Sequence, residues 1–376
     1  MYQSSNRILF FLALITGAYL FPACNNQAPP QPLEEVEDIE LLMSDFQIAG
    51  LSVAVIKDFQ IEFLEHHGVT DQRQKDDVTA STLFQVGDIS KSVTSMAALA
   101  FSAEGKIPLT VDINNYLTSW QLEENNNTAI QKVTLGRLLT HTGGINEETF
   151  AGYVEGESVP SLFQLLNGQS PANNNPIQVT ATPGTQFNYS SGGHLVIQQA
   201  MEDVSGTDFA SLMKTRIFDP IGMVSSAFEQ PLSANKQVVA ASGHTAQTRV
   251  LDGKYYTYPQ LAPLGLWSTA EDMGKFLIEI QNSARGQSNQ VLDQSNAANM
   301  ISSLVVNGFG VGFFLQDIGN ETYFLETGTN SGYTALIFGH KELGIGTVIL
   351  TNGEDKLEFV ERMLNIVATH QNWPGF

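Results

Sequence analysis

The stretch Leu83-Phe-Gln-Val-Gly-Asp-Ile-Ser-Lys91 leads into the most clearly bounded helix of the sequence. The pattern predicts a helix over residues 89–103 that ends before Gly105. Aspartate is favoured at helix N-termini, so capping alone would explain its presence at position 88. Lys91 lies one helical turn beyond Asp88, which places the two side chains on the same face. The sequence therefore predicts an acid and a base side by side where this helix begins.

Strand patterns lie near both ends of the chain. Residues 50–56 and 60–65 are rich in β-branched and apolar residues and flank a three-residue turn, which predicts a hairpin. An acidic amphipathic helix is expected at 33–46, and a closing helix at 357–370. Four further strands are expected at residues 308–314, 323–326, 333–338 and 346–350.

The order of these elements predicts two lobes. Strands at both ends enclose a middle region in which helical patterns alternate with loops rich in Asn, Gly and Pro. We therefore expect an α/β lobe built from residues 33–87 and 231–376, and a mainly helical lobe inserted at 88–230.

Composition excludes several classes of function. The chain has 376 residues, of which 39 are acidic and 18 basic, giving a net charge of −21. Such a chain repels phosphate backbones, so no nucleic-acid partner is expected. The seven histidines lack metal-like spacing, and the adjacent pair His66-His67 would point to opposite faces of a strand. We expect no metal site and no cofactor.

The N-terminus has the pattern of an export signal. Residues 8–20 form an apolar run that is short for a membrane span, and Phe21-Pro-Ala-Cys24 resembles a bacterial lipobox. We expect residues 1–23 to be a signal peptide and 24–32 a Pro-rich tether. Either Cys24 is lipidated, or an ordinary signal is cut near Ala23. In both cases we expect an exported protein, located in the periplasm or as an outer-membrane lipoprotein, that meets the membrane only through the N-terminal lipid.

Six segments occur together in a characteristic order: residues 83–91, 133–145, 183–191, 217–223, 266–273 and 326–333. In order and spacing they resemble the serine β-lactamase and penicillin-binding-protein family, above all its class C and esterase branch. The resemblance covers about residues 45 to 370. It implies a β-lactamase/DD-peptidase-like α/β (α+β) fold, with an antiparallel sheet flanked by helices, an inserted helical lobe and an active site in the crevice between the lobes.

The three active-site motifs depart from that family. Asp88 stands where the nucleophilic serine of Ser-x-x-Lys belongs, although Lys91 is kept. Tyr189-Ser-Ser191 replaces Tyr-x-Asn, and Glu326-Thr-Gly328 replaces Lys/His-x-Gly. The resemblance therefore implies Asp88, Lys91, Tyr189 and Glu326 as catalytic residues. It implies Ser191, Thr327 and Gly328 as substrate-binding residues.

The substituted residues suggest a different chemistry. An aspartate is ionised at neutral pH and could act as a nucleophile or activate water. A buried glutamate facing it across the crevice would have a raised pKa, which suits a general acid. Two such carboxyl groups are the arrangement used in glycoside hydrolysis. Trp267 and the tyrosines at 255, 256 and 258 belong either to the core or to an aromatic platform for a sugar ring. On the second interpretation, Trp267 is predicted to bind substrate.

Three functional hypotheses remain open. The first is a carboxylate-based glycoside hydrolase or transglycosylase acting on a small-molecule or oligosaccharide substrate. The second is a serine-type esterase or peptidase whose nucleophile lies elsewhere, for example at Ser90. The third is a catalytically inactive relative that binds envelope glycans or peptides. Turnover of β-lactams is not expected, because Glu326 would repel their carboxylate. The sequence does not specify the sugar, the linkage, the stereochemical outcome or the oligomeric state.

Overall fold

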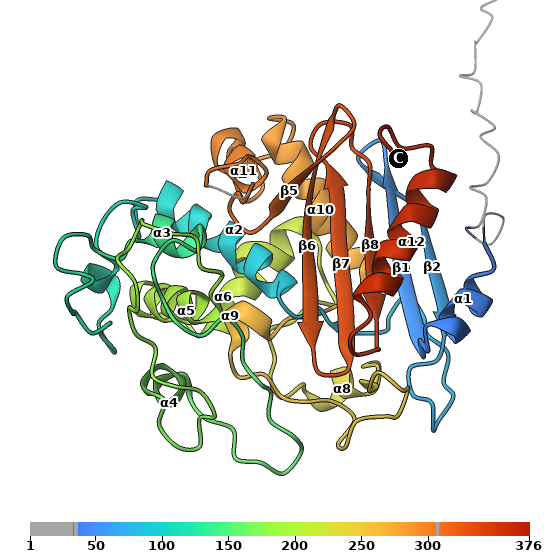
Figure 1. The fold of residues 1–376 in the computed structure, drawn as a ribbon, viewed down its shortest axis with the longest axis horizontal. Helices are drawn as coiled ribbons and strands as arrows, with labels where there is room; N and C mark the ends of the chain where they lie inside the picture. The colour runs from blue at the N-terminus through green and yellow to red at the C-terminus, as the bar shows by residue number, and fades with distance from the viewer. Residues whose placement is uncertain (1–32, 34–36, 306–307) are drawn as a thin grey trace, which may run out of the picture. The chain divides into compact units, whose positions relative to one another are not determined.

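The computed structural model describes Leu33 and residues 37–305 and 308–376, and its main feature is a six-stranded antiparallel sheet (Figure 1). The strand order is β2-β1-β8-β7-β6-β5. The strands are β1 (Gly50–Lys57), β2 (Gln60–Gly68), β5 (Phe314–Ile318), β6 (Glu321–Asn330), β7 (Tyr333–His340) and β8 (Gly346–Thr351). The expected α/β fold class with an antiparallel sheet is confirmed. The signal peptide, the tether and Cys24 lie outside the described residues.

Strands from near the two ends of the chain pair with each other in the sheet. β1 pairs with β2 in the predicted hairpin, and its other edge pairs with β8 from Leu51↔Thr351 to Ile56↔Gly346. The hairpin turn places Asp58 and Phe59 at positive φ, the backbone of a tight two-residue turn. The sheet therefore forms only when segments nearly 300 residues apart in the sequence come together.

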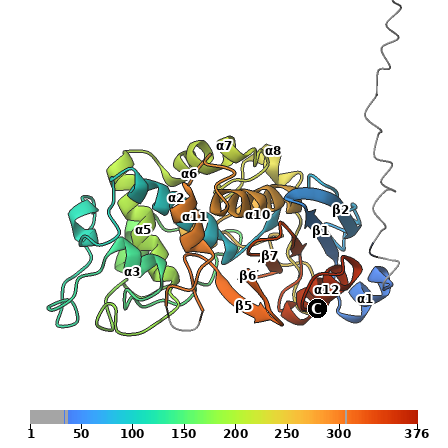
Figure 2. The same ribbon diagram turned by 90° about the horizontal axis from the view of Figure 1, so that it is seen from above.

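Each face of the sheet buries alternate side chains. Leu51, Val53 and Val55 pack with α1 (Ile39–Asp45) and α12 (Leu357–His370) in one apolar cluster. The intervening Ala54 and Ile56 belong to the other cluster, which includes the buried side of α10 (Ala270–Ala284). Figure 2 shows α1 and α12 on one side of the sheet and α10 on the other. This alternation follows from the two-residue period of a β-strand.

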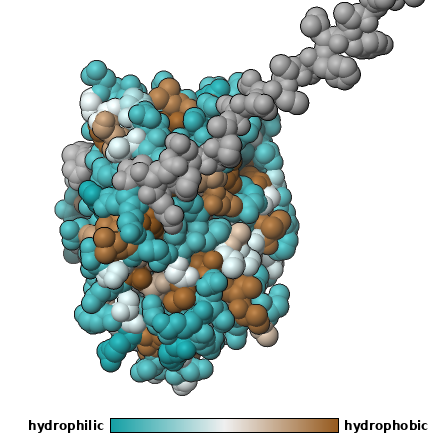
Figure 3. All heavy atoms as spheres, turned by 90° about the vertical axis from the view of Figure 1, so that its right-hand side faces the viewer, coloured by the Kyte–Doolittle hydropathy of each residue, from teal (hydrophilic) through white to brown (hydrophobic). Residues whose placement is uncertain are grey.

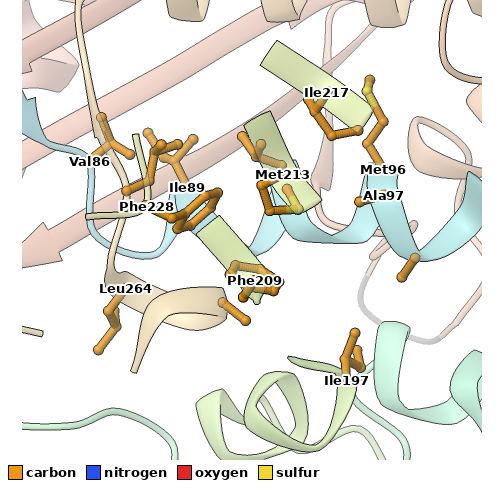
Figure 4. Close-up of a cluster of buried hydrophobic side chains, with 14 of the residues drawn as sticks. Val86, Ile89, Met96, Ala97, Ile197, Phe209, Met213, Ile217, Phe228 and Leu264 are labelled. Atoms are coloured by element: carbon orange, nitrogen blue, oxygen red, sulfur yellow. The ribbon is translucent and has the colours of Figure 1, made fainter. Parts of the chain in front are cut away.

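Helices from the middle of the chain pack around α2 (Ile89–Ala103), which is buried over most of its length. Figure 4 shows Ile89 of α2 beside Phe228, and Met96 of α2 beside Ile217. The remaining helices are η2 (Ile113–Tyr116), α3 (Leu135–Leu139), α4 (Leu162–Asn167), α5 (Ser191–Ser205), α6 (Phe209–Met213), η3 (Lys214–Phe218), α7 (Asp219–Ile221), α8 (Ala234–Gln237), α9 (Leu261–Leu264) and α11 (Gln294–Met300). A short pair of strands, β3 (Phe84–Gln85) and β4 (Trp267–Ser268), lies beside the start of α2. The exact boundary between the two predicted lobes stays a prediction.

Two predicted elements begin later in the structure than expected. The strand expected at 308–314 begins only at Phe314, because Gly308 and Gly312 have φ values of +70° and +86° that interrupt an extended backbone. The helix expected at 33–46 is described from Ile39 to Asp45. It begins there because the Asp38 side chain accepts a hydrogen bond from the Leu41 N–H and so caps it.

The face of the described part that Figure 3 shows is mostly polar. In the view of Figure 3, apolar residues appear singly or in small groups among hydrophilic ones. Within residues 37–305 and 308–376, each helix is too short or too polar to cross a bilayer.

The packing of α12 on the sheet yields a stability prediction. Met363 is fully buried against the sheet, whereas Glu361 on the same helix is exposed. We expect Met363→Ala to lower the free energy of unfolding by about 2–5 kcal/mol, because it removes buried methylene groups and leaves a cavity. Glu361→Ala is the matched control and should change it by less than about 0.5 kcal/mol. Urea denaturation of both variants measures the difference, and equal losses would contradict this account of the sheet face.

Candidate active site

Asp88 directs its carboxylate into the site instead of capping α2. Its backbone is helical (φ −59°, ψ −21°), and its side chain makes no capping hydrogen bond. Oδ1 accepts from Lys91 Nζ at 2.5 Å, while Oδ2 accepts from the N–H and Oγ1 of Thr329 at 3.2 and 3.4 Å. The alternative explanation of Asp88 as a helix cap is therefore wrong. Its carboxylate instead joins α2 to β6.

Lys91 and Tyr189 link Asp88 to Glu326. The Lys91 side chain is 1% exposed, and its ammonium lies 4.9 Å from the centre of the Tyr189 ring. The Tyr189 hydroxyl donates to Glu326 Oε1 at 3.4 Å. The structure thus brings together the four residues that the resemblance implied as catalytic, from the start of α2, the segment before α5 and strand β6.

The two carboxyl groups of the site lie in different environments. Glu326 is 4% exposed, and both burial and the nearby charge of Asp88 raise its pKa well above the ordinary 4.5. Burial likewise raises the pKa of the Tyr189 phenol, with the charges of Glu326 and Asp88 adding to it. Asp88, by contrast, is ion-paired with Lys91. The site therefore holds a carboxylate with a counter-ion beside a carboxyl group whose protonated form is favoured.

Close backbone packing fixes this arrangement. A Cβ at Gly328 would lie 1.8 Å from the Val86 carbonyl oxygen, and one at Gly87 would lie 2.4 Å from the Thr329 nitrogen. Gly87 also has a φ of +52°, which favours glycine. These two glycines let the turn before α2 rest directly on β6.

The predicted substrate-binding residues differ in their exposure and contacts. Gly328 lies in the contact just described, and Thr327 is partly exposed, with its backbone N–H hydrogen-bonded to the Glu326 carboxyl group. Ser191 begins α5 but is fully buried, and its hydroxyl donates to the Glu148 carbonyl at 2.7 Å. The Ser191 hydroxyl therefore anchors the loop around Glu148 to the start of α5.

Trp267 does not offer the surface expected of a sugar platform. Its side chain is 0% exposed within strand β4 and packs edge-on against Tyr255 and Tyr333. The core interpretation of Trp267 is correct, and its prediction as a substrate-binding residue was wrong. The reason is that β4 pairs with β3 in the interior, next to the start of α2.

Ser90 is unsuited to be a nucleophile. It is 0% exposed, its hydroxyl donates to the Gly87 carbonyl at 2.6 Å, and it accepts from the Leu266 N–H at 3.1 Å. Both bonds join backbone segments around the start of α2. The hypothesis that Ser90 is the nucleophile of a serine-type enzyme is therefore wrong.

Two buried histidines lie behind the site. Neither was predicted from the sequence as a site residue. His141 Nδ1 accepts from the Ser190 N–H at 3.0 Å, and its ring centre lies 4.3 Å from that of Tyr189. Burial, His194 and Lys91 hold the pKa of His141 well below 6.5, and burial lowers the pKa of His194 to about 3. Both rings are therefore neutral at pH 7 and pack against the site without adding positive charge to it.

Sequence reasoning also missed Thr329. It lies three residues after Glu326 on the same strand and donates twice to Asp88. The motif after Glu326 was followed only as far as Gly328, and following the strand by one more residue would have included it. As for metals, the described residues contain no group of three His, Cys, Asp or Glu side chains arranged to hold an ion.

The sequence of this chain is similar to those of several known proteins. A family model described as Beta-lactamase matches residues 37–370. Among curated proteins, Protein flp of Staphylococcus aureus strain MRSA252 is 20% identical over 332 residues, which cover 87% of this chain and 64% of that protein. The chain thus spans less than two thirds of the length of that relative. A Beta-lactamase of Pseudomonas fluorescens is 28% identical over 190 residues, covering 49% of this chain and 47% of that protein.

Solved structures share the fold. The octameric penicillin-binding protein homologue from Pyrococcus abyssi superposes with a TM-score of 0.75 at 21% identity, covering 91% of this chain and 78% of that one. The D-alanine carboxypeptidase AmpC from Burkholderia cenocepacia gives a TM-score of 0.71 at 20% identity, covering 90% and 98%. At these identities the likeness concerns the fold.

The buried carboxyl group of Glu326 predicts a pH-dependent stability. Its raised pKa means that the folded chain binds this proton more tightly than the unfolded chain does. The stability it contributes is fully present below the ordinary pKa of 4.5 and is lost as pH rises toward the folded value. We expect Glu326→Gln to match the parent at pH 4 and to gain on it above pH 4.5, by up to about 1.4 kcal/mol per pH unit.

Urea denaturation between pH 4 and 8 measures this difference. Glu358→Gln, at an exposed position on α12, serves as the control. Its free energy of unfolding should change with pH in the same way as that of the parent. Parallel curves for Glu326→Gln as well would show that Glu326 is ionised in the folded chain.

Proposed function

The chain belongs to the β-lactamase family, and we propose that it is a hydrolase in which the carboxyl pair Asp88/Glu326 replaces the serine nucleophile and cleaves a glycosidic bond. The observation that carries this proposal is the unequal environment of the two groups. Asp88 is paired with the Lys91 ammonium at 2.5 Å, whereas the pKa of buried Glu326 is raised well above its usual value. A charged and a protonated carboxyl group at one site are what glycoside hydrolysis requires.

Each residue has a defined role in this proposal. Glu326 donates its proton to the leaving oxygen as the glycosidic bond breaks, and Tyr189 orients that carboxyl group through its hydroxyl. Asp88 either attacks the anomeric carbon or removes a proton from the attacking water. The Lys91 ammonium is the counter-ion of the Asp88 carboxylate. The separation of the two carboxyl groups in the substrate complex selects between a retaining and an inverting route.

A second candidate is a non-catalytic relative that binds an envelope glycan or peptide. It is favoured by the three hydrogen bonds that Asp88 already accepts, from Lys91 Nζ and from the N–H and hydroxyl of Thr329. A nucleophile held in this way must give up part of that network before it reacts. Activity measurements on defined glycosides separate the two candidates.

A panel of 4-nitrophenyl glycosides tests the catalytic proposal. We expect turnover of at least one member with a bell-shaped pH–rate profile, since one carboxyl group must be charged and the other protonated. Asp88→Asn and Glu326→Gln should each lower kcat by at least about 100-fold, the scale of general acid–base catalysis. Asp112→Asn, which changes a capping aspartate of η2, should leave kcat unchanged.

The Asp88 variant needs a folding control. Asn at position 88 leaves the buried Lys91 ammonium without its counter-charge, at a cost of about 3–5 kcal/mol. Assays therefore run well below the melting temperature of each variant, measured by circular dichroism. Full activity in folded Asp88→Asn would overturn the role of Asp88. Hydrolysis of nitrocefin, or labelling by a fluorescent phosphonate, would point to a serine enzyme instead.

We further propose that the chain is exported and anchored through a lipid on Cys24. The support is the apolar run at residues 8–20, followed by a small residue and the one cysteine of the sequence. When the full chain is expressed in a bacterial host, radiolabelled palmitate should be incorporated into the parent and not into Cys24→Ser. Equal labelling of both, or no labelling of the parent, would contradict lipidation.

A further inference from the structure

We propose that the partly exposed rings of Phe187 and Phe314, beside Tyr189, form a subsite that binds the apolar face of a neutral sugar ring. The inference rests on the proposed glycosidic function and names a substrate class for the same site. It also moves the aromatic platform away from Trp267, which is fully buried.

The rings form one connected cluster. Phe314 stacks with Tyr189 at a centroid distance of 6.1 Å and an interplanar angle of 23°, and Phe187 lies 6.3 Å from Phe314. Phe309 is 0% exposed and lies 4.7 Å from Phe314 and 5.5 Å from Phe187. His141, whose ring lies 5.0 Å from Phe309, completes the base of the cluster. The outer rings are thus supported from beneath by buried rings.

The cluster adjoins the reacting groups. Tyr189 stacks with Phe314 through its ring and bonds Glu326 through its hydroxyl. A ligand lying on the outer rings would therefore meet the proposed general acid at the end of the tyrosine. Phe187, Tyr189 and Phe314 each keep part of their surface exposed, although phenylalanine is usually buried. An apolar patch next to polar catalytic groups is typical of a binding site.

The charges nearby select a neutral occupant. The carboxyl groups of Asp88, Glu148 and Glu326 all act on the Tyr189 hydroxyl. Lys91, the cation over the Tyr189 ring, is neutralised by Asp88. Because Lys91 is already paired with Asp88, its ammonium is not available to bind an anionic ligand, whereas a neutral sugar can place its C–H face on a ring and direct its hydroxyls toward the carboxyl oxygens. These features favour a neutral glycan over an acidic one.

Binding by the Glu326→Gln variant tests the subsite without turnover. The probes are three tetrasaccharides: cellotetraose and chitotetraose, which are neutral, and tetragalacturonate, which is acidic. We expect binding of a neutral probe, with saturation transfer in NMR from aromatic protons to its ring C–H groups, and no binding of tetragalacturonate. Phe187→Leu and Phe314→Leu, made in the same background, should each weaken binding about 5- to 10-fold. Leucine keeps apolar volume and so protects the fold.

Phe163→Leu is the matched control. Phe163 is 51% exposed on α4 and lies outside the cluster, so its substitution should leave affinity unchanged. Unchanged affinity in the Phe187 and Phe314 variants, equal binding of tetragalacturonate, or no binding of either neutral probe would overturn the subsite. Failure of the proposed glycosidic function would give a different result. In that case a neutral probe binds through the two phenylalanines, while no glycoside is cleaved or Asp88→Asn keeps full activity.

Discussion

The close approach of β6 to the turn before α2 is the constraint on which the site depends. A Cβ at Gly328 would lie 1.8 Å from the Val86 carbonyl oxygen, so glycine alone permits this contact. The approach puts the Thr329 N–H within hydrogen-bond distance of Asp88. Asp88 therefore bonds across to the sheet, although an aspartate at a helix start would otherwise cap its own helix. Glu326, two residues before Gly328, is brought to the same site by the same contact.

The ion pair changes what Lys91 can do. In the family that the sequence resembles, the corresponding lysine serves as a base for the serine. The Lys91 side chain is 1% exposed, and its Nζ lies 2.5 Å from Asp88 Oδ1, so the two groups form an ion pair. Lys91 therefore acts as a counter-ion for Asp88. In the proposed mechanism Glu326 donates the proton, since burial raises its pKa and favours the protonated form.

Much of the fold could be predicted from the sequence because its signals are local. The β1–β2 hairpin and α12 follow from residue patterns within short windows, and the structure has both. The aromatic cluster could not be predicted in this way, since Phe187 and Phe314 are more than 100 residues apart and meet only through the fold. Trp267 was misjudged for a related reason. An aromatic side chain looks the same in a sequence whether its strand is interior or exposed.

The buried carboxyl group of Glu326 bears on whether the site is active. A carboxyl group with a raised pKa weakens the folded state as pH rises above 4.5, so at neutral pH it costs stability. A binding module that needed only shape could hold Gln at this position without that cost. Removing the ion pair altogether is often neutral or stabilising when well-packed apolar residues replace both partners. The site thus contains ionisable groups that packing alone does not require. They are Glu326 and the ion pair of Asp88 with Lys91. The proposed proton transfer from Glu326, which bonds the Tyr189 hydroxyl, does require them.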